Sequence, residues 1–224
     1  LQYQPVLAHL RAHDGATSAA LRRALAVAAF ERTSAYDGAI ASWARGALVA
    51  ADDPAREGVL RSTALRYGEN PQQAGTAVPI AGRDPLSVLA ATPLGGKALS
   101  YNNLLDGAAA LELVQDLVAC RGTALPDVEA AVVVKHTNPC GAAIAGTPAE
   151  AVRFALGGDP LAAYGGIVAL SADVDDAVAA VLVDSGSFLE VVVAPRFEPS
   201  AAELLAGRWK NVRLLPVGTI TPPR

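Results

Sequence analysis

The alternation of short apolar runs and helical segments between Ala130 and Val217 constrains the fold of this chain more than any other feature. Runs typical of strands buried on both faces occupy residues 130–135, 166–171, 189–194 and 212–217. Segments with helical periodicity lie between them, at residues 147–156, 173–183 and 200–207. This alternation predicts an α/β domain in which helices flank a largely parallel sheet.

Two of these helices begin with a capping-box pattern. Thr147 is followed three positions later by Glu150, and Ser200 is followed in the same way by Glu203. In a capping box the hydroxyl and the glutamate satisfy backbone N–H groups that the start of a helix leaves without partners. We therefore predict that Thr147 and Ser200 are the N-caps of their helices.

The sequence before residue 130 predicts a further helical part and a domain boundary. Residues 17–48 are rich in alanine and leucine at helical spacing, and residues 106–118 form a second amphipathic pattern. Residues 50–58 are polar and contain a proline, as is typical of a linker. We place a boundary there, which gives an N-terminal part at residues 1–50 and a larger part at residues 51–224.

Composition excludes several classes of partner. Hydrophobic residues make up 52% of the chain and charged residues 18%, which favours a buried core over disorder. The net charge of −4, with acidic and basic residues interspersed, provides no basic patch for a nucleic acid, and no apolar run has the length of a membrane span. The two cysteines cannot form a disulfide framework and suit a reducing compartment. We expect a cytoplasmic protein with no nucleic-acid or membrane partner.

The chain opens on Leu1 and contains no methionine. A natural reading frame begins with methionine, so we expect these residues to be part of a longer polypeptide. Some of the function is then expected to lie outside them.

The segment "VVVKHTNPCGAA", residues 132–143, places Lys135 and His136 where the strongest strand candidate ends. Ligands of open α/β sheets bind at the carboxyl ends of the strands. Neighbouring strand residues point to opposite faces, so both side chains can meet one ligand only if the strand has already ended, and Asn138-Pro139 favours such an ending. A single histidine at a strand end is more often structural, but the adjacent lysine favours a catalytic pair.

Four other positions have both a structural and a functional interpretation. Arg66, in "LRYGENPQQ", offers a planar charged group for a phosphate or carboxylate, although the segment also fits an ordinary turn. Asn103, in "LSYNNLLD", suits either a helix N-cap or a ligand contact. Gly165, one of two adjacent glycines, permits close backbone approach to a ligand, and Glu190 interrupts an apolar strand and needs a partner.

Two motifs that suggest a phosphate loop or a zinc site do not hold. The segment "GGKALS" has Ala98 where a phosphate loop needs serine or threonine after the lysine, and it lacks the earlier glycine. The segment "HTNPCG" has neither the glutamate nor the second cysteine of the zinc nucleobase deaminases. We therefore predict no metal site.

Five segments, taken together and in this order, resemble the aminoimidazole carboxamide ribonucleotide (AICAR) transformylase region of the bifunctional purine-biosynthesis family: "LRYGENPQQ", "GKALSYNNLLD", "VVVKHTNPCGAA", "DPLAAYGGIVAL" and "FLEVVVAP". They cover roughly residues 64–217, and residues 7–43 resemble the end of the inosine monophosphate (IMP) cyclohydrolase domain that precedes the transformylase. The resemblance implies a cytidine-deaminase-like three-layer α/β/α sandwich with an N-terminal helical segment. It also implies that residues 51–224 are the first transformylase subdomain.

The resemblance further implies a reaction and the residues that perform it. A formyl group moves from 10-formyltetrahydrofolate, the co-substrate, to the 5-amino group of AICAR, and intact family members cyclise the product to IMP. His136 matches the proton acceptor, and Lys135 matches the residue that stabilises the transition state. The positions that match nucleotide-binding residues are Arg66, Tyr67, Asn103, Gly165 and Glu190.

The resemblance also implies that parts of both family sites lie outside these residues. The second transformylase subdomain and the front of the cyclohydrolase domain have no counterpart here, and the family forms homodimers with transformylase sites between subunits. We therefore expect the chain alone to be inactive and to self-associate. The alternative is a non-catalytic nucleotide-binding or dimerisation module, against which the presence of both Lys135 and His136 argues.

Overall fold

The chain divides into two units, Leu1–Leu60 and Arg61–Arg224. The computed structural model describes residues 3–48, 63–78, 86–121, 125 and 127–222. The predicted boundary after residue 50 lies outside the described residues.

The first unit is helical. It contains α1 (Tyr3–Ala12) and α2 (Ala19–Ala47), and the hydroxyl of Ser18 caps α2 by accepting a hydrogen bond from the backbone N–H of Leu21 at 3.1 Å. The helix predicted at residues 17–48 is thus confirmed. Among the described parts of the whole chain, no helix combines the length and the apolar character needed to cross a bilayer.

The second unit is built on a five-stranded sheet with the order β4-β3-β5-β6-β7. The strands span Glu129–Lys135 (β3), Asn138–Ala145 (β4), Gly166–Leu170 (β5), Leu189–Ala194 (β6) and Arg213–Pro216 (β7). The pairs β5–β6 and β6–β7 are parallel, whereas β3 is antiparallel to both β4 and β5. The expectation of a largely parallel sheet is therefore wrong at the β4–β3–β5 end of the sheet. There a tight turn, and not a helix, joins β3 to β4, so the two strands run in opposite directions.

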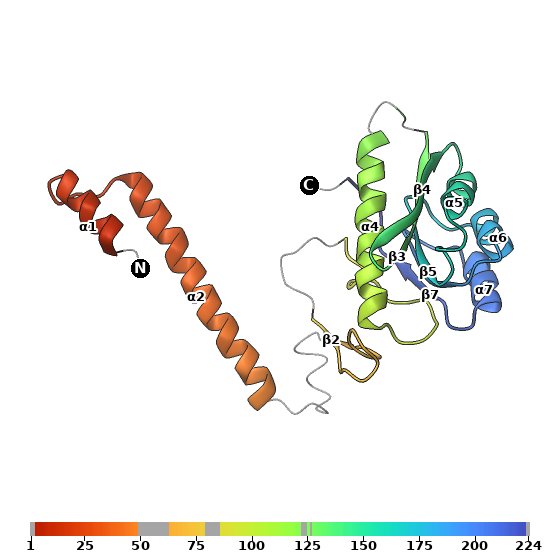
Figure 1. Cartoon of the computed structure of the whole chain (residues 1–224), viewed down its shortest axis with the longest axis horizontal. Coiled ribbons are helices and arrows are strands. Elements are labelled where there is room, and N and C mark those ends of the chain that lie inside the picture. The colour runs from red at the N-terminus through yellow and green to blue at the C-terminus, as the bar shows by residue number, and fades with distance from the viewer. Residues whose placement is uncertain (1–2, 49–62, 79–85, 122–124, 126, 223–224) are drawn as a thin grey trace. The chain divides into compact units, whose positions relative to one another are not determined.

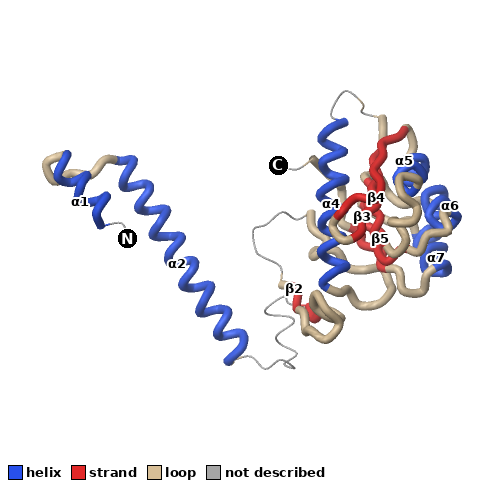
Figure 2. The backbone as a smooth tube through the Cα atoms, in the orientation of Figure 1, coloured by secondary structure: helices blue, strands red, loops and turns tan. Residues whose placement is uncertain are grey.

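Helices cover both faces of this sheet and make three layers (Figure 1). The long α4 (Tyr101–Arg121) lies on one face, and α5 (Pro148–Leu156), α6 (Asp176–Asp184) and α7 (Pro199–Arg208) lie on the other (Figure 2). Alternate residues of β3 supply the two cores: Val132 and Val134 pack on the α4 side, while Ala131 and Val133 pack on the other. The α/β/α layering that was expected is confirmed.

The two predicted capping boxes have different outcomes. Thr147 caps α5 as predicted, with its hydroxyl accepting from the Glu150 N–H at 3.3 Å. The prediction for Ser200 is wrong, because α7 begins at Pro199 and its N-cap, Glu198, makes no side-chain cap bond. Proline has the backbone angle that the first helical position requires, so the helix starts one residue before the serine.

A small hairpin carries one polar loop to the start of α4. Strands β1 (Thr63–Ala64) and β2 (Thr76–Ala77) pair antiparallel, and the Arg66-Tyr67 segment lies between them. The Arg66 N–H donates to the Leu99 carbonyl at 2.8 Å, and the Tyr101 N–H donates to the Tyr67 carbonyl at 3.1 Å. These bonds fix the loop beside the first turn of α4.

Candidate active site

The turn between β3 and β4 presents Lys135 and His136 together. Lys135 is the last residue of β3 and pairs with Asn138, so His136 and Thr137 form a two-residue turn, with positive φ angles of 52° and 61°. The strand therefore ends before Asn138, and that residue begins a new strand instead of a loop. Both basic side chains can face one ligand only if the strand has ended, and the turn at His136 and Thr137 ends it. The predicted ending, at Asn138-Pro139, lay two residues later.

A cavity of about 340 Å³ collects nearly all the predicted site residues. Lys135 and His136 line it together with Tyr67, Asn103, Gly165 and Glu190. Because β3 runs antiparallel to β5, its carboxyl end meets the amino ends of β5 and β6, where Gly165 and Glu190 lie. The site thus forms at the amino ends of the parallel strands, which differs from the expectation for an open parallel sheet.

Lys135 is anchored, whereas the imidazole of His136 is free. The Lys135 Nζ donates to the backbone carbonyl of Tyr164 at 2.7 Å, which uses one of its three protons. Within the described residues, no group bonds to either ring nitrogen of His136. The lysine is therefore held in place over the cavity, and both ring nitrogens of the histidine are available to a ligand.

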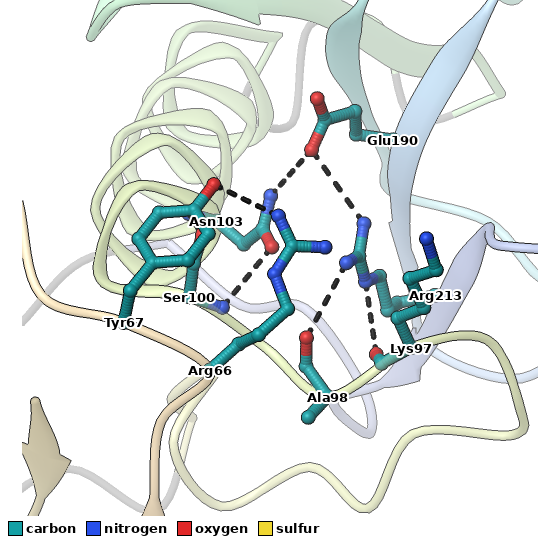
Figure 3. Close-up of polar contacts among 8 residues, drawn as sticks. All are labelled: Arg66, Tyr67, Lys97, Ala98, Ser100, Asn103, Glu190 and Arg213. Atoms are coloured by element: carbon teal, nitrogen blue, oxygen red, sulfur yellow. Dashed lines mark hydrogen bonds and ion pairs between the residues drawn. The ribbon is translucent and has the colours of Figure 1, made fainter. Parts of the chain in front are cut away.

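Glu190 is the centre of a polar cluster that Figure 3 shows in close-up. Its Oε2 accepts from Asn103 Nδ2 at 2.8 Å and lies 3.5 Å from Nη1 of Arg213. Its other oxygen, Oε1, has no partner among the residues that the structure describes. Glu190, a carboxylate in an apolar strand, is thus paired with Asn103 and Arg213 through Oε2, and its Oε1 is left to accept a hydrogen bond from a ligand.

Asn103 is a cavity residue and not an N-cap. Its Oδ1 accepts from the backbone N–H of Ser100 at 3.1 Å (Figure 3). Ser100 directly precedes α4, and its hydroxyl accepts in turn, at 3.3 Å, from the N–H of Asn103, one of the first-turn N–H groups that have no partner within the helix. The N-cap interpretation of Asn103 is wrong, because α4 begins two residues earlier at Tyr101. The Asn103 side chain instead bonds back to Ser100, and its amide nitrogen donates to Glu190.

Arg213 is a buried cation at the start of β7. Only 3% of the residue is exposed, and its guanidinium donates to the carbonyl oxygens of Lys97 at 3.0 Å and Ala98 at 3.3 Å. Burial lowers the pKa of Arg213, while the charge of Glu190 opposes this shift. Since guanidinium groups titrate far above neutral pH, Arg213 stays charged and holds Glu190 against the "GGKALS" loop.

Arg66 lies next to the cavity but is not among the residues that line it. Its Nη2 donates to the hydroxyl of Tyr67 at 3.0 Å, and its guanidinium carbon is 4.6 Å from the centre of that ring. Figure 3 shows the guanidinium between Tyr67 and Arg213, and its positive charge contributes to lowering the pKa of Arg213. Arg66 is thus an exposed cation at the rim, where an anionic group of a ligand could reach it.

Gly165 allows the chain to turn tightly between Tyr164 and β5. Its φ angle of +77° lies in the left-handed region that favours glycine, and its N–H donates to the Phe188 carbonyl at 2.7 Å. This turn brings the Tyr164 carbonyl to the Lys135 ammonium. The glycine therefore contributes to the site through the backbone turn, and its close approach to a ligand stays a prediction.

Sequence reasoning missed several residues in and around this site, among them the charged residues Asp106 and Arg213. Asp106 lines the cavity and bonds to the turn that carries His136. A signal existed for each. Asp106 follows Asn103 by three residues and so lies on the same helical face, and Arg213 is a charge in an apolar strand, as Glu190 is.

One other hollow in the described residues lacks comparable chemistry. A hollow of about 400 Å³ between α5 and α6 is lined largely by apolar or small residues, with Arg153 and Asp184 as its charged groups. No group of three or more histidine, cysteine, aspartate or glutamate side chains in the described ranges is arranged to hold a metal ion. The cavity at Lys135 is therefore the candidate site.

A family model described as the AICARFT/IMPCHase bienzyme matches residues 1–223. The chain belongs to this family. The match includes both units, and with it the whole set of residues around the cavity.

Curated members of the AICARFT/IMPCHase family are similar along nearly the whole chain. The bifunctional purine biosynthesis protein PurH of Rhodopirellula baltica is 43% identical over 227 residues, covering 99% of this chain and 42% of that protein. PurH of a Synechococcus species is 46% identical over 225 residues, covering 96% and 41%. The chain thus spans about two fifths of the length of the curated relatives it matches.

Among solved structures, the two forms of Acinetobacter baumannii RibD have a weak likeness to the chain. Form 1 is 18% identical, covers 50% of this chain and 35% of its own, and has a TM-score of 0.39. Form 2 has a TM-score of 0.36. A likeness at this level supports no argument about function or detailed fold.

Proposed function

We propose that the natural polypeptide containing this chain transfers a formyl group from 10-formyltetrahydrofolate to the 5-amino group of AICAR, in de novo purine biosynthesis. One observation carries the proposal: a single cavity collects Lys135, His136, Tyr67, Asn103, Gly165 and Glu190. Membership of the AICARFT/IMPCHase family supports the same reaction. We propose that the whole polypeptide also cyclises the product to IMP.

The chemistry of the two basic residues fits formyl transfer. As the amine nitrogen attacks the formyl carbon, the carbonyl oxygen becomes an oxyanion, which the Lys135 ammonium would stabilise. The imidazole of His136 would accept the proton that the amine loses. The bond from the formyl carbon to the folate nitrogen then breaks, and that nitrogen gains a proton.

The remaining polar groups would bind the nucleotide. Oε1 of Glu190 is available to accept a hydrogen bond from a ligand hydroxyl or amine, and the amide of Asn103 fixes the carboxylate. The rim guanidinium of Arg66 suits the nucleotide phosphate. We propose no role for a metal ion.

The wider expectations from the family also stay proposals. We propose that the domain fold is of the cytidine-deaminase type, that the protein forms a homodimer, and that it acts in the cytoplasm. Several large apolar side chains on α2, among them Phe30 and Trp43, are not buried within the first unit, which supports their packing against another surface. Both cysteines are free, as a reducing compartment requires.

Formyl transfer measured with purified protein tests the proposal. We expect activity in the natural polypeptide and none in residues 1–224 alone. His136→Ala should lower kcat by about 10²–10⁴-fold, as for the loss of a general base, and Lys135→Ala by about 10²–10³-fold. The matched control, Lys210→Ala, removes an exposed lysine far along the chain and should leave kcat unchanged.

Two results would contradict the proposal. The first is a natural polypeptide that binds AICAR but transfers no formyl group, which would favour the non-catalytic module. The second is full activity in both the Lys135→Ala and the His136→Ala variants.

A further inference from the structure

The turn that carries His136 has an unusual backbone. Both of its residues, His136 and Thr137, have positive φ angles, 52° and 61°. Two-residue hairpin turns of this kind prefer asparagine, aspartate and glycine, and a β-branched residue such as threonine is an outlier there. Such a conformation persists only where surrounding groups hold it.

One carboxylate, from Asp106 on α4, bonds to both residues of this turn. Its Oδ2 accepts from the His136 N–H at 3.2 Å, and its Oδ1 accepts from the Thr137 N–H at 2.8 Å. Two successive N–H groups can point at one carboxylate because both residues adopt the left-handed conformation. On the other side of the turn, the His136 carbonyl accepts from the Thr137 hydroxyl at 2.7 Å and from Asn138 Nδ2 at 2.8 Å.

Asp106 also belongs to the cavity, and it acts from the same helical face as Asn103. The two residues are three positions apart, and both line the cavity. Asn103 fixes Glu190 on one side, and Asp106 fixes the turn with His136 on the other. The start of α4 therefore sets the relative positions of the predicted nucleotide-binding carboxylate and the predicted base.

From this geometry we infer that Asp106 is a positioning residue. Its carboxylate holds the turn of His136 and Thr137 in the left-handed conformation and so places the His136 imidazole in the cavity. An ordinary surface aspartate would have no such effect on the turn. The kinetic consequence of the inference rests on the proposed function, whereas the conformational one does not.

Hydrogen exchange of the backbone amides of His136 and Thr137 tests the conformational part in the chain itself. Asp106→Asn offers one acceptor and one donor in place of two acceptors, so one turn N–H loses its partner. We expect exchange at these two amides to become at least tenfold faster, with no change in the protection of β5. Asp116→Asn, an exposed aspartate of the same helix, is the matched control and should change neither.

A glycine at position 137 separates positioning from general packing. Glycine adopts positive φ without help from a carboxylate. In the Thr137→Gly background, Asp106→Asn should therefore change the exchange of the His136 amide much less than it does with threonine present. In the natural polypeptide, Asp106→Asn should lower kcat about 10²-fold with Thr137 and less than tenfold with glycine there, while the KM for AICAR changes little.

Equal amide exchange in the Asp106→Asn and Asp116→Asn variants would overturn the inference. So would an exchange effect of Asp106→Asn that is the same with threonine or glycine at position 137. If the natural polypeptide transfers no formyl group, the proposed function fails, and the exchange measurements still decide the inference about Asp106.

Discussion

At the scale of single residues, the site depends on charged side chains that specific hydrogen-bond partners hold in place. Arg213 is the most deeply buried of them, and it contacts Glu190 and the carbonyl oxygens of Lys97 and Ala98. The geometry of the guanidinium matters here, because its N–H groups diverge in one plane toward separate acceptors. A lysine has the same charge but cannot reach all three.

We therefore expect Arg213→Lys to lower the free energy of unfolding by about 1–3 kcal/mol, since buried acceptors lose their donors. Urea unfolding of the chain measures this change. Arg153→Lys, at an exposed position of α5, is the matched control and should change stability by less than about 0.5 kcal/mol. Equal stability of the two variants would show that the buried contacts of Arg213 contribute nothing.

Cys140, next to the active-site turn, should react slowly as a nucleophile. Burial, followed by the charge of Asp159, raises the pKa of Cys140 above its ordinary value. A raised pKa leaves less thiolate at neutral pH. The rate of alkylation of Cys140 should therefore increase only at pH values above the ordinary pKa of a cysteine thiol. Mass spectrometry after iodoacetamide treatment at several pH values measures this, with exposed Cys120 in the same chain as the reference. If the midpoint of the pH dependence of Cys140 alkylation lies at or below the ordinary pKa of a cysteine thiol, the raised pKa is contradicted.

At the scale of elements, sequence patterns predict most of the second unit but not β4. Strands β3, β5 and β6 contain β-branched runs and β7 contains two adjacent leucines, so their buried character is visible in the sequence. Strand β4, "NPCGAAIA", contains proline and glycine and only one β-branched residue. Its conformation comes from pairing with β3 and from packing on α5, neither of which a local pattern contains. Missing β4 also led to the wrong expectation of strand direction.

Gly141 shows how closely β4 packs on α5. A Cβ atom at this position would lie 1.8 Å from the carbonyl oxygen of Ala155, which is backbone and cannot move away cheaply. We expect Gly141→Ala to destabilise the chain by about 1–3 kcal/mol or more, by forcing the strand and helix apart. Thermal and urea unfolding measure this effect.

Gly146 provides the control for this substitution. It lies just after β4, and a Cβ atom there would meet nothing within 4 Å. Gly146→Ala should change stability by less than about 0.5 kcal/mol. Equal effects at the two glycines would mean that close packing of β4 on α5 is not what requires glycine at position 141.

At the scale of the whole molecule, the sequence indicates which kinds of residue form the site more readily than it indicates how they are arranged in space. Basic residues at a strand end and a carboxylate in an apolar strand were visible in the sequence, and the structure places them around one cavity. The family resemblance, now confirmed over residues 1–223, joined them to the loop at Arg66 and Tyr67. The role of Asp106 was not predictable, because it depends on the left-handed turn and on how α4 packs beside it.

The measurement that tests the central claim most directly is a calorimetric titration of AICAR into this 224-residue chain. The same titration is made with a Lys135→Ala, His136→Ala double variant and with Lys210→Ala as the control. If the cavity at the end of β3 is the nucleotide site, the chain and the control bind AICAR, and the double variant binds at least tenfold more weakly. Equal affinity in all three proteins would contradict the claim that this cavity holds the nucleotide, whereas no binding by any of them would mean that residues outside this chain supply the essential contacts.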